Sequence, residues 1–256
     1  MNKGYKGYLI DLDGTMYKGN ESIPEAADFI ERLRRSNKPF LFLTNNSTAS
    51  AKGVVENLKR RSNVEAYPNE VFTSTDATIH YLNEKNAKRV FVIGEAGLLD
   101  GLQASGFEIA DEDVDAVVVG LDTEVNYEKL MEATLLIQAG AEFIGTNPDT
   151  NMPTELGLVP GNGALLSFLE TSTGTQATVI GKPQAIIMDA ALDVLGLSKD
   201  EVLMVGDNYK TDIQAGIRNE IDTLLVLTGF TSEADVATLP TPATYVIDTL
   251  NDWDII

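Results

Sequence analysis

Two carboxylates stand two residues apart at the end of an apolar segment near the N-terminus. The segment Tyr8-Leu9-Ile10 runs directly into Asp11-Leu12-Asp13-Gly14-Thr15. Successive strand residues point to opposite faces, so Asp11 and Asp13 should share one side, and Gly14 should let the chain turn sharply after them. Such a pair can hold a hard cation and one reacting phosphorus. The same letters occur in calcium loops and in ordinary Asp-Gly turns, so this motif alone leaves those interpretations open.

Three further polar segments follow apolar segments that we predict to be strands. The first, Thr44-Asn45-Asn46-Ser47, is suited to bind phosphate oxygens through side chains and N–H groups. The second is Lys182 in a Gly-Lys-Pro turn, and the third is Gly206-Asp207-Asn208, after which Asp212 is expected to open the next helix. Taken singly, each has a plainer interpretation: a helix N-cap cluster, a solvated surface lysine and a capping carboxylate.

Short apolar segments alternate with helical patterns along the two ends of the chain. This alternation predicts an α/β fold with a parallel sheet. The predicted strands are Gly7 to Leu12, Pro39 to Thr44, Thr178 to Ile180, Val202 to Gly206, Thr223 to Leu227 and Tyr245 to Ile247. The predicted helices between them are Pro24 to Ser36, Ser50 to Arg61, Gln184 to Leu195 and Asp212 to Ile217.

The middle of the chain repeats the alternation of strands and helices on its own, which is enough for a second α/β unit. We expect it to be an insertion, because the polar strand ends that look catalytic fall before and after it. The predicted domains are therefore an outer core of residues 1–82 and 178–256 and an inserted unit of residues 83–177.

Open α/β sheets bind ligands beyond the carboxyl ends of their strands. The four polar segments should therefore surround one crevice, with one basic group, one hydroxyl and four carboxylates among their side chains. Together they make coincidence the less probable interpretation. The set consists of Asp11, Asp13, Thr44, Asn45, Lys182, Asp207 and Asp212.

The composition narrows the class of protein. A formal charge of -20 should repel nucleic acids and anionic membranes, so we expect neither as a partner. The absence of cysteine excludes disulfides, thiolate catalysis and Cys-based metal sites. No apolar run suggests a signal peptide or a membrane span, which favours a cytoplasmic protein. A phosphate site in so acidic a chain must carry its own positive charge from a metal, a lysine and N–H groups.

With these motifs in this order, the chain resembles the haloacid dehalogenase (HAD) superfamily of aspartyl-phosphate phosphatases. The insertion, with Thr146-Asn147-Pro148-Asp149 and Gly161-Asn162-Gly163, resembles the α/β cap of the NagD and para-nitrophenyl phosphatase branch. The resemblance implies a Rossmann-like parallel-sheet core with an inserted α/β cap. Asp13 favours a phosphatase over a dehalogenase, which has no leaving alkoxide to protonate.

The resemblance also implies a role for each motif residue. Asp11 would attack phosphorus, and Asp13 would protonate the leaving group and later deprotonate water. The cofactor would be Mg²⁺, bound by Asp11, the main-chain carbonyl of Asp13, Asp207 and Asp212, the last directly or through water. The residues expected to hold the substrate are Thr44, Asn45 and Lys182 in the core and Asn147 and Asp149 in the cap.

The expected activity is Mg²⁺-dependent hydrolysis of small phosphate esters such as nucleoside monophosphates, sugar phosphates and para-nitrophenyl phosphate. Two alternatives keep the phospho-aspartate: a phosphotransferase such as a mutase, and a receiver-like phospho-switch protein, which is usually a single domain without a cap. A third is a non-catalytic phosphate-binding protein, which would not need Asp13. A homodimer through the cap is compatible with the resemblance, although nothing in the composition demands one.

Overall fold

The computed structural model, which describes residues 3–154 and 156–256, divides into two units. The first contains the chain up to Thr44, Ala51–Phe72 and Lys182–Ile256, and the second contains Asn45–Ser50 and Thr73–Gly181. The boundaries expected from the sequence, at 82/83 and 177/178, differ from this division. The second unit also includes the segment 45–50 and the helix of residues 74–84, because Ser74 and Thr75 donate hydrogen bonds to the carbonyls of Asn45 and Ser47.

A six-stranded sheet forms the centre of the first unit. Strand β1 pairs in parallel with β4 on one side and with β13 on the other, and β14 and β15 continue the sheet in parallel. Strands β1, β4 and β13 are buried along their whole length, as expected for parallel strands covered on both faces. The sheet order is β15 (Tyr245–Ile247), β14 (Asp222–Val226), β13 (Val202–Gly206), β1 (Gly7–Ile10), β4 (Phe40–Thr44) and β5 (Val71–Thr73).

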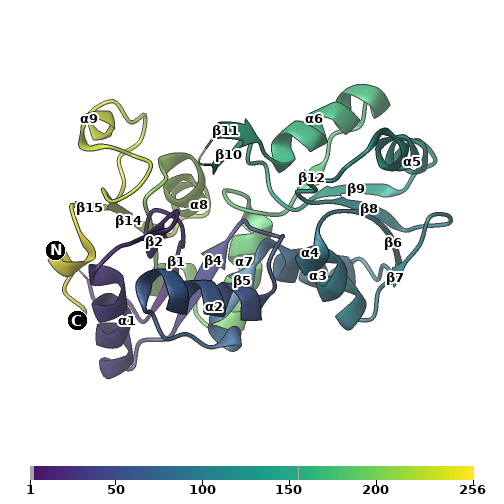
Figure 1. Cartoon of the computed structure of the whole chain (residues 1–256). Helices are drawn as coiled ribbons and strands as arrows, with labels where there is room; N and C mark the ends of the chain where they lie inside the picture. Colours follow the sequence, from purple (N-terminus) through teal and green to yellow (C-terminus); the bar gives the residue numbers. More distant parts are fainter. Residues whose placement is uncertain (1–2, 155) are drawn as a thin grey trace. The chain divides into compact units, whose positions relative to one another are not determined.

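Helices cover both faces of this sheet, with α1 and α2 on one face and α7 and α8 on the other (Figure 1). The buried residues of α1, Ala26, Phe29, Ile30 and Leu33, recur at the spacing of one helix face. A small antiparallel hairpin of β2 (Tyr17–Lys18) and β3 (Glu21–Ser22) follows β1. The helices are α1 (Glu25–Arg35), α2 (Ala51–Ser62), α7 (Ala185–Leu195), α8 (Gln214–Arg218) and α9 (Glu233–Val236).

The second unit has a parallel sheet of its own. Its order is β12 (Thr178–Val179), β9 (Glu142–Gly145), β8 (Ala116–Val119), β6 (Arg89–Ile93) and β7 (Glu108–Ile109). Helices α5 (Tyr127–Gln138) and α6 (Asn162–Thr173) lie on one face, and α3 (Ser74–Glu84) and α4 (Ala96–Ala104) on the other (Figure 1). The first pair closes a core that includes Phe91, Val117, Phe143 and Leu166. An antiparallel hairpin of β10 (Asn151–Thr154) and β11 (Gly157–Pro160) completes the unit.

One predicted strand belongs to the other sheet. The segment Thr178 to Ile180 was expected in the sheet of the first unit, but Thr178 and Val179 pair with Ile144 and Gly145 at the edge of the second sheet. The main-chain carbonyl of Gly145 accepts a hydrogen bond from the N–H of Ile180 at 2.9 Å, and so extends this edge. Lys182, which belongs to the first unit, therefore lies in a turn and not at the end of one of that unit's strands.

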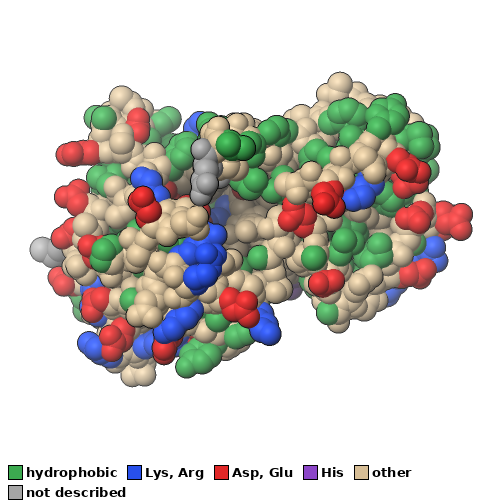
Figure 2. All heavy atoms as spheres, in the orientation of Figure 1, with side chains coloured by type: hydrophobic (Ala, Val, Ile, Leu, Met, Phe, Trp, Pro, Cys, Tyr) green, Lys and Arg blue, Asp and Glu red, His purple; other side chains and the backbone are tan. Residues whose placement is uncertain are grey.

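The surface matches the acidic composition. Asp and Glu side chains are scattered over the face of the molecule shown in Figure 2. Within the described ranges, no helix combines the length and the apolar character needed to cross a membrane.

The C-terminal segment is held against the first unit by an aromatic and charged clamp. Trp253 is buried and contacts the rings of Tyr5 and Tyr245, while Arg32 donates hydrogen bonds to the carbonyls of Leu250 and Trp253 at 2.7 and 2.6 Å. This clamp anchors the edge strand β15, because the ring of Tyr245 meets the ring of Trp253 edge to face.

We predict that Trp253→Ala lowers the free energy of unfolding by roughly 3–5 kcal/mol, because it leaves a cavity under the clamp. Urea denaturation followed by circular dichroism measures the change. Ile256→Ala is the control, since Ile256 is 66% exposed and should change stability by less than about 0.5 kcal/mol. Equal effects of the two substitutions would contradict the structural role given to Trp253.

Candidate active site

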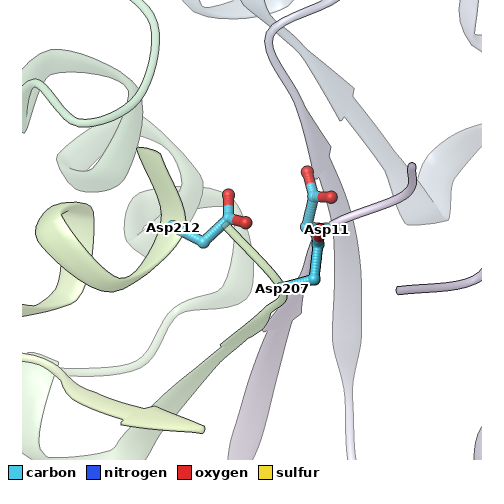
Figure 3. A group of neighbouring side chains, drawn as sticks. All are labelled: Asp11, Asp207 and Asp212. Carbon is cyan, nitrogen blue, oxygen red and sulfur yellow. The ribbon is translucent and has the colours of Figure 1, made fainter. Parts of the chain in front are cut away.

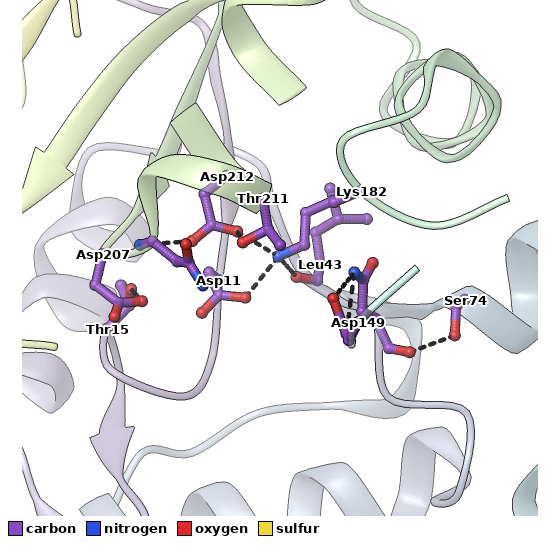
Figure 4. A network of polar contacts seen from close by, with 11 residues as sticks. Asp11, Thr15, Leu43, Ser74, Asp149, Lys182, Asp207, Thr211 and Asp212 are labelled. Atoms are coloured by element: carbon purple, nitrogen blue, oxygen red, sulfur yellow. Dashed lines mark hydrogen bonds and ion pairs between the residues drawn. The ribbon is translucent and has the colours of Figure 1, made fainter. Parts of the chain in front are cut away.

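A buried lysine lies at the centre of the carboxyl edge of the first sheet. The ammonium of Lys182 is 2.5 Å from a carboxylate oxygen of Asp11 and 2.8 Å from one of Asp212, and it donates a third hydrogen bond to the carbonyl of Leu43 at 2.8 Å (Figure 4). Its side chain is only 1% exposed. A lysine so buried needs such partners, because an isolated ammonium would pay a large desolvation penalty.

Three carboxylates converge beside this lysine. Asp11 follows β1, Asp207 follows β13, and Asp212 lies in the turn after Asp207; Figure 3 shows their carboxylate groups around one common space. One oxygen from each lies within 4.8 Å of the others. The donors are all hard oxygens, which are the ligands of Mg²⁺ and Ca²⁺ in proteins. The residues present therefore fit a hard divalent cation.

Close approach of these groups requires two glycines. A Cβ atom at Gly14 would lie 2.1 Å from a carboxylate oxygen of Asp207, and one at Gly229 would lie 1.9 Å from the same oxygen. Gly14 also has φ of +90°, a conformation that residues with a side chain rarely adopt. The backbone of Gly14 and Gly229 can thus pack directly against Asp207, whose carboxylate accepts the N–H of Phe230 at 2.5 Å and the hydroxyl of Thr15 at 3.4 Å.

Burial and mutual repulsion set the protonation of the cluster. Burial, and then the charge of Asp212, raise the pKa of Asp11 well above its usual range, although Lys182 acts in the opposite direction. The same two causes raise the pKa of Asp207 to about 7. Burial alone would lower the pKa of Lys182, but the attraction of Asp11 and Asp212 outweighs it and the pKa is raised. The lysine is therefore charged, whereas the carboxyls of Asp11 and Asp207 keep their protons to higher pH than an ordinary aspartate.

Contrary to the sequence-based expectation, Asp13 does not share one side of a strand with Asp11. Strand β1 ends at Ile10, so strand alternation does not extend to Asp13, and its carboxylate is not part of the three-carboxylate cluster among the described residues. Instead it is exposed and accepts the N–H of Gly19, in the β2–β3 hairpin, at 3.3 Å. Asp13 therefore lies at the rim of the site, outside the cluster of Asp11, Asp207 and Asp212.

Asp212 does not open a helix, contrary to the prediction. It lies inside a π-helical turn, η3 (Tyr209–Ile213), and α8 begins only at Gln214. The capping side chain is that of Asn208, which accepts the N–H of Lys210. Asp212 is thereby free to turn inward, where its carboxylate bonds Lys182 and accepts the N–H of Asn208 at 3.1 Å.

Comparison with known proteins identifies the family of the chain. The sequence matches the haloacid dehalogenase-like hydrolase family over residues 8–108 and a HAD-hydrolase-like family over residues 179–253. The chain belongs to the haloacid dehalogenase-like hydrolases. The two matches together cover more than half of the chain and contain Asp11, Lys182, Asp207 and Asp212.

Two relatives that are similar over nearly the whole chain have the names of phosphate-ester hydrolases. An acid sugar phosphatase of Staphylococcus epidermidis is 50% identical over 97% of this chain and 96% of its own length. The 5′-nucleotidase YutF of Bacillus subtilis is 47% identical over 98% of each chain.

Solved structures agree with this placement. A thermostable NPPase from Geobacillus stearothermophilus, determined as a double mutant, superposes with a TM-score of 0.92 and 47% identity over 99% of each chain. NagD from E. coli superposes with a TM-score of 0.93 and 31% identity over 99% of this chain and 100% of its own. This HAD-like hydrolase lies in the NagD-like, p-nitrophenyl phosphatase branch and is a phosphoric monoester hydrolase.

The loop after β14 is a part of the HAD-like site that the sequence interpretation missed. The hydroxyl of Thr228 donates to the carbonyl of Gly14 at 2.6 Å, and the next two residues, Gly229 and Phe230, enclose Asp207. The strand itself was expected, and Thr-Gly directly after a buried strand is the same kind of signal as the other motifs. Following every strand to its carboxyl end would have found it.

The substrate-binding candidates divide between the units of this hydrolase. Thr44 is buried at the end of β4 in the first unit. Within the second unit, Asn45 donates to the carboxylate of Asp149 at 3.2 and 3.3 Å, and Asn147 donates to the carbonyl of Asn45 at 2.9 Å. Asn45, one of the two residues selected from the second motif, thus contacts both residues selected in the insertion.

We predict that Asp207→Asn stabilises the metal-free enzyme at pH 8 by roughly 1–3 kcal/mol. The folded-state pKa of about 7 is above the ordinary value. As pH rises past the ordinary value, the unfolded state releases its proton first, so this group lowers stability progressively until pH exceeds about 7. The variant removes that penalty.

Urea denaturation in the presence of a chelator, at pH 4 and pH 8, tests this. The difference between variant and wild type should be small at pH 4 and largest at pH 8. Asp193→Asn, which changes an exposed carboxyl on α7, is the matched control and should show no such pH dependence. A less stable Asp207→Asn protein at pH 8 would refute the assignment of burial and repulsion by Asp212 as the causes of the raised pKa.

Proposed function

We propose that this protein is a Mg²⁺-dependent phosphatase that hydrolyses small phosphomonoesters through a phospho-aspartyl intermediate on Asp11. The observation that carries the proposal is the position of the Asp11 carboxylate, bonded to the buried Lys182 and next to two further carboxylates. Sugar phosphates and nucleoside monophosphates are the proposed substrates, with p-nitrophenyl phosphate as a synthetic one. The printed names of its relatives support this range.

In the first step, the Asp11 carboxylate attacks phosphorus. The bond from phosphorus to the leaving oxygen breaks, its electron pair stays on that oxygen, and Asp13 donates the proton. Lys182, Thr44 and Asn45 hold the non-bridging oxygens while charge builds on them.

In the second step, Asp13 takes a proton from water, and the water attacks the phosphorus of phospho-Asp11. Inorganic phosphate leaves and the Asp11 carboxylate is restored. The exposed position of Asp13 at the rim supports this role, because a group that serves both the leaving group and water must reach solvent.

The proposed metal ligands are Asp11, the main-chain carbonyl of Asp13, Asp207 and Asp212, the last directly or through water. A bound Mg²⁺ would supply positive charge that offsets the repulsion between the Asp11 carboxylate and the phosphate oxygens. The donor set supports Mg²⁺, because it consists of hard carboxylate oxygens.

Asn147 and Asp149 are proposed as substrate-contacting residues of the second unit. Their hydrogen bonds with Asn45 support this, since they connect the insertion to the second motif. Asp149 would accept hydrogen bonds from substrate hydroxyls, which suits sugars and nucleosides.

We predict that Asp11→Asn lowers kcat by at least roughly a thousandfold on every substrate, because an amide cannot attack phosphorus. Phosphate release from p-nitrophenyl phosphate, sugar phosphates and nucleoside monophosphates, with Mg²⁺ and with chelator, measures it. Asp193→Asn is the control for a change of one charge on the same unit and should keep full activity.

Acid quench and mass spectrometry of the wild-type enzyme should then find one phosphoryl group on the peptide that contains Asp11. Metal-dependent turnover without any such adduct, and unaffected by Asp11→Asn, would overturn the mechanism. A long-lived adduct without phosphate release would favour a phospho-switch, and transfer to a second sugar would favour a mutase.

A further inference from the structure

The β2–β3 hairpin holds Asp13 from two sides. The main chain of Tyr17 pairs with Asp13 and accepts the N–H of Gly14 at 2.6 Å, and the N–H of Gly19 binds the Asp13 carboxylate. The hairpin is only two residues long in each strand, and both residues of β3 are exposed. So short a hairpin is marginally stable by itself and depends on packing against another element.

That element is α2, and Arg61 in its last turn makes the specific contact. Helix α2 packs against both strands of the hairpin, and the guanidinium of Arg61 lies over the ring of Tyr17 at 4.8 Å from its centroid. Tyr17 is only 7% exposed, so the surrounding residues restrict the motion of its ring. A cation over a desolvated aromatic face is attracted by the negative face of the ring.

Arg61 has an unusual environment for an arginine. Its Nε atom is buried and finds no hydrogen-bond partner within residues 3–154 and 156–256. Buried donors are usually paired, and an exception calls for a reason. Its neighbour Arg60, by contrast, is exposed and binds Asn57 on the same helix. The guanidinium of Arg61 has therefore lost part of its hydration, and its contact with the Tyr17 ring compensates for that loss.

We propose that Arg61 is a positioning residue for the reaction: by holding the Tyr17 ring, it fixes the hairpin and the Asp13 carboxylate for proton transfer to the leaving oxygen. The inference rests on the acid role proposed for Asp13. Arg61 acts through Tyr17 and the backbone of the hairpin, and it takes no part in breaking or forming bonds.

The consequence depends on the leaving group. When an alkyl phosphate reacts, the electron pair of the broken bond would form a basic alkoxide, so proton donation matters greatly. When p-nitrophenyl phosphate reacts, the leaving phenolate is stable without a proton. A misplaced Asp13 carboxyl should therefore slow alkyl phosphates and largely spare p-nitrophenyl phosphate.

The experiment compares leaving-group release in the first turnover, at saturating substrate, for glycerol phosphate and p-nitrophenyl phosphate. For Arg61→Met, the rate with glycerol phosphate should fall roughly tenfold, while the rate with p-nitrophenyl phosphate should fall less than about threefold. The ratio of the two rates in one sample does not depend on the fraction of folded protein. Partial unfolding of a variant therefore cannot produce the effect.

Conservative and control variants complete the design. Arg61→Lys keeps a cation over the ring and should have a ratio close to that of the wild type, and Tyr17→Phe keeps both the ring and Arg61 and should also preserve the ratio. Arg60→Met removes a neighbouring charge from the same helix and should leave the ratio unchanged.

Two results with Arg61→Met would overturn the proposal. Equal losses with both substrates would assign Arg61 a structural role only, and a change confined to the half-saturating concentration would make it a substrate contact. Asp13→Asn is the reference for the underlying mechanism. If it loses both rates equally, the acid role itself is refuted and the inference falls with it; if it is selective and Arg61→Met is not, the inference alone is refuted.

Discussion

The ion cluster around Lys182 is the interaction on which the site depends. The buried ammonium of Lys182 bonds Asp11, the carbonyl of Leu43 and Asp212, which lie 171, 139 and 30 residues from it in the chain. Removing one partner of such a buried cluster is far more costly than removing an exposed pair, because the remaining charge stays desolvated. The cluster therefore fixes the carboxyl ends of β1 and β4 to the turn after β13, and it defines where a phosphate can be held.

Backbone without side chains makes the cluster geometrically possible. Asp207 fits against Gly14 and Gly229 only because neither has a Cβ atom, and the hydroxyl of Thr228 bonds the carbonyl of Gly14. The loop after β1, which contains Gly14, and the loop after β14, which contains Thr228 and Gly229, thus pack closely against each other and against Asp207. A pair of like charges cannot be brought this close by local preference alone; the packing of the sheet edge imposes it, and the raised pKa values of Asp11 and Asp207 are the result.

The sequence contained enough to locate most of this edge of the sheet. Buried parallel strands appear as short apolar runs, and polar residues at their ends mark the ligand edge, so Asp11 and Asp207 could be placed together without a structure. Two features could not be obtained this way. The first is that the strand before Lys182 joins the other sheet, where Thr178 pairs with Ile144. This pairing is between residues far apart in the sequence, and a local pattern does not encode it. The inward orientation of Asp212 depends on a π-helical turn, which has no distinct sequence signal.

The balance of charge in this cluster bears directly on the chemistry. Three carboxylates face one ammonium, in a chain whose formal charge is -20, and a phosphate ester brings further negative charge to the same place. Long-range electrostatics therefore oppose the arrival of the substrate, and only local positive charge and N–H groups can reverse this. Lys182 already serves Asp11 and Asp212, so one ammonium cannot also neutralise the phosphate. A divalent cation among the carboxylates would lower the pKa values of Asp11 and Asp207, offset the repulsion in the cluster and leave Lys182 available to the phosphate oxygens, which is the physical reason that a metal-dependent phosphatase suits this site.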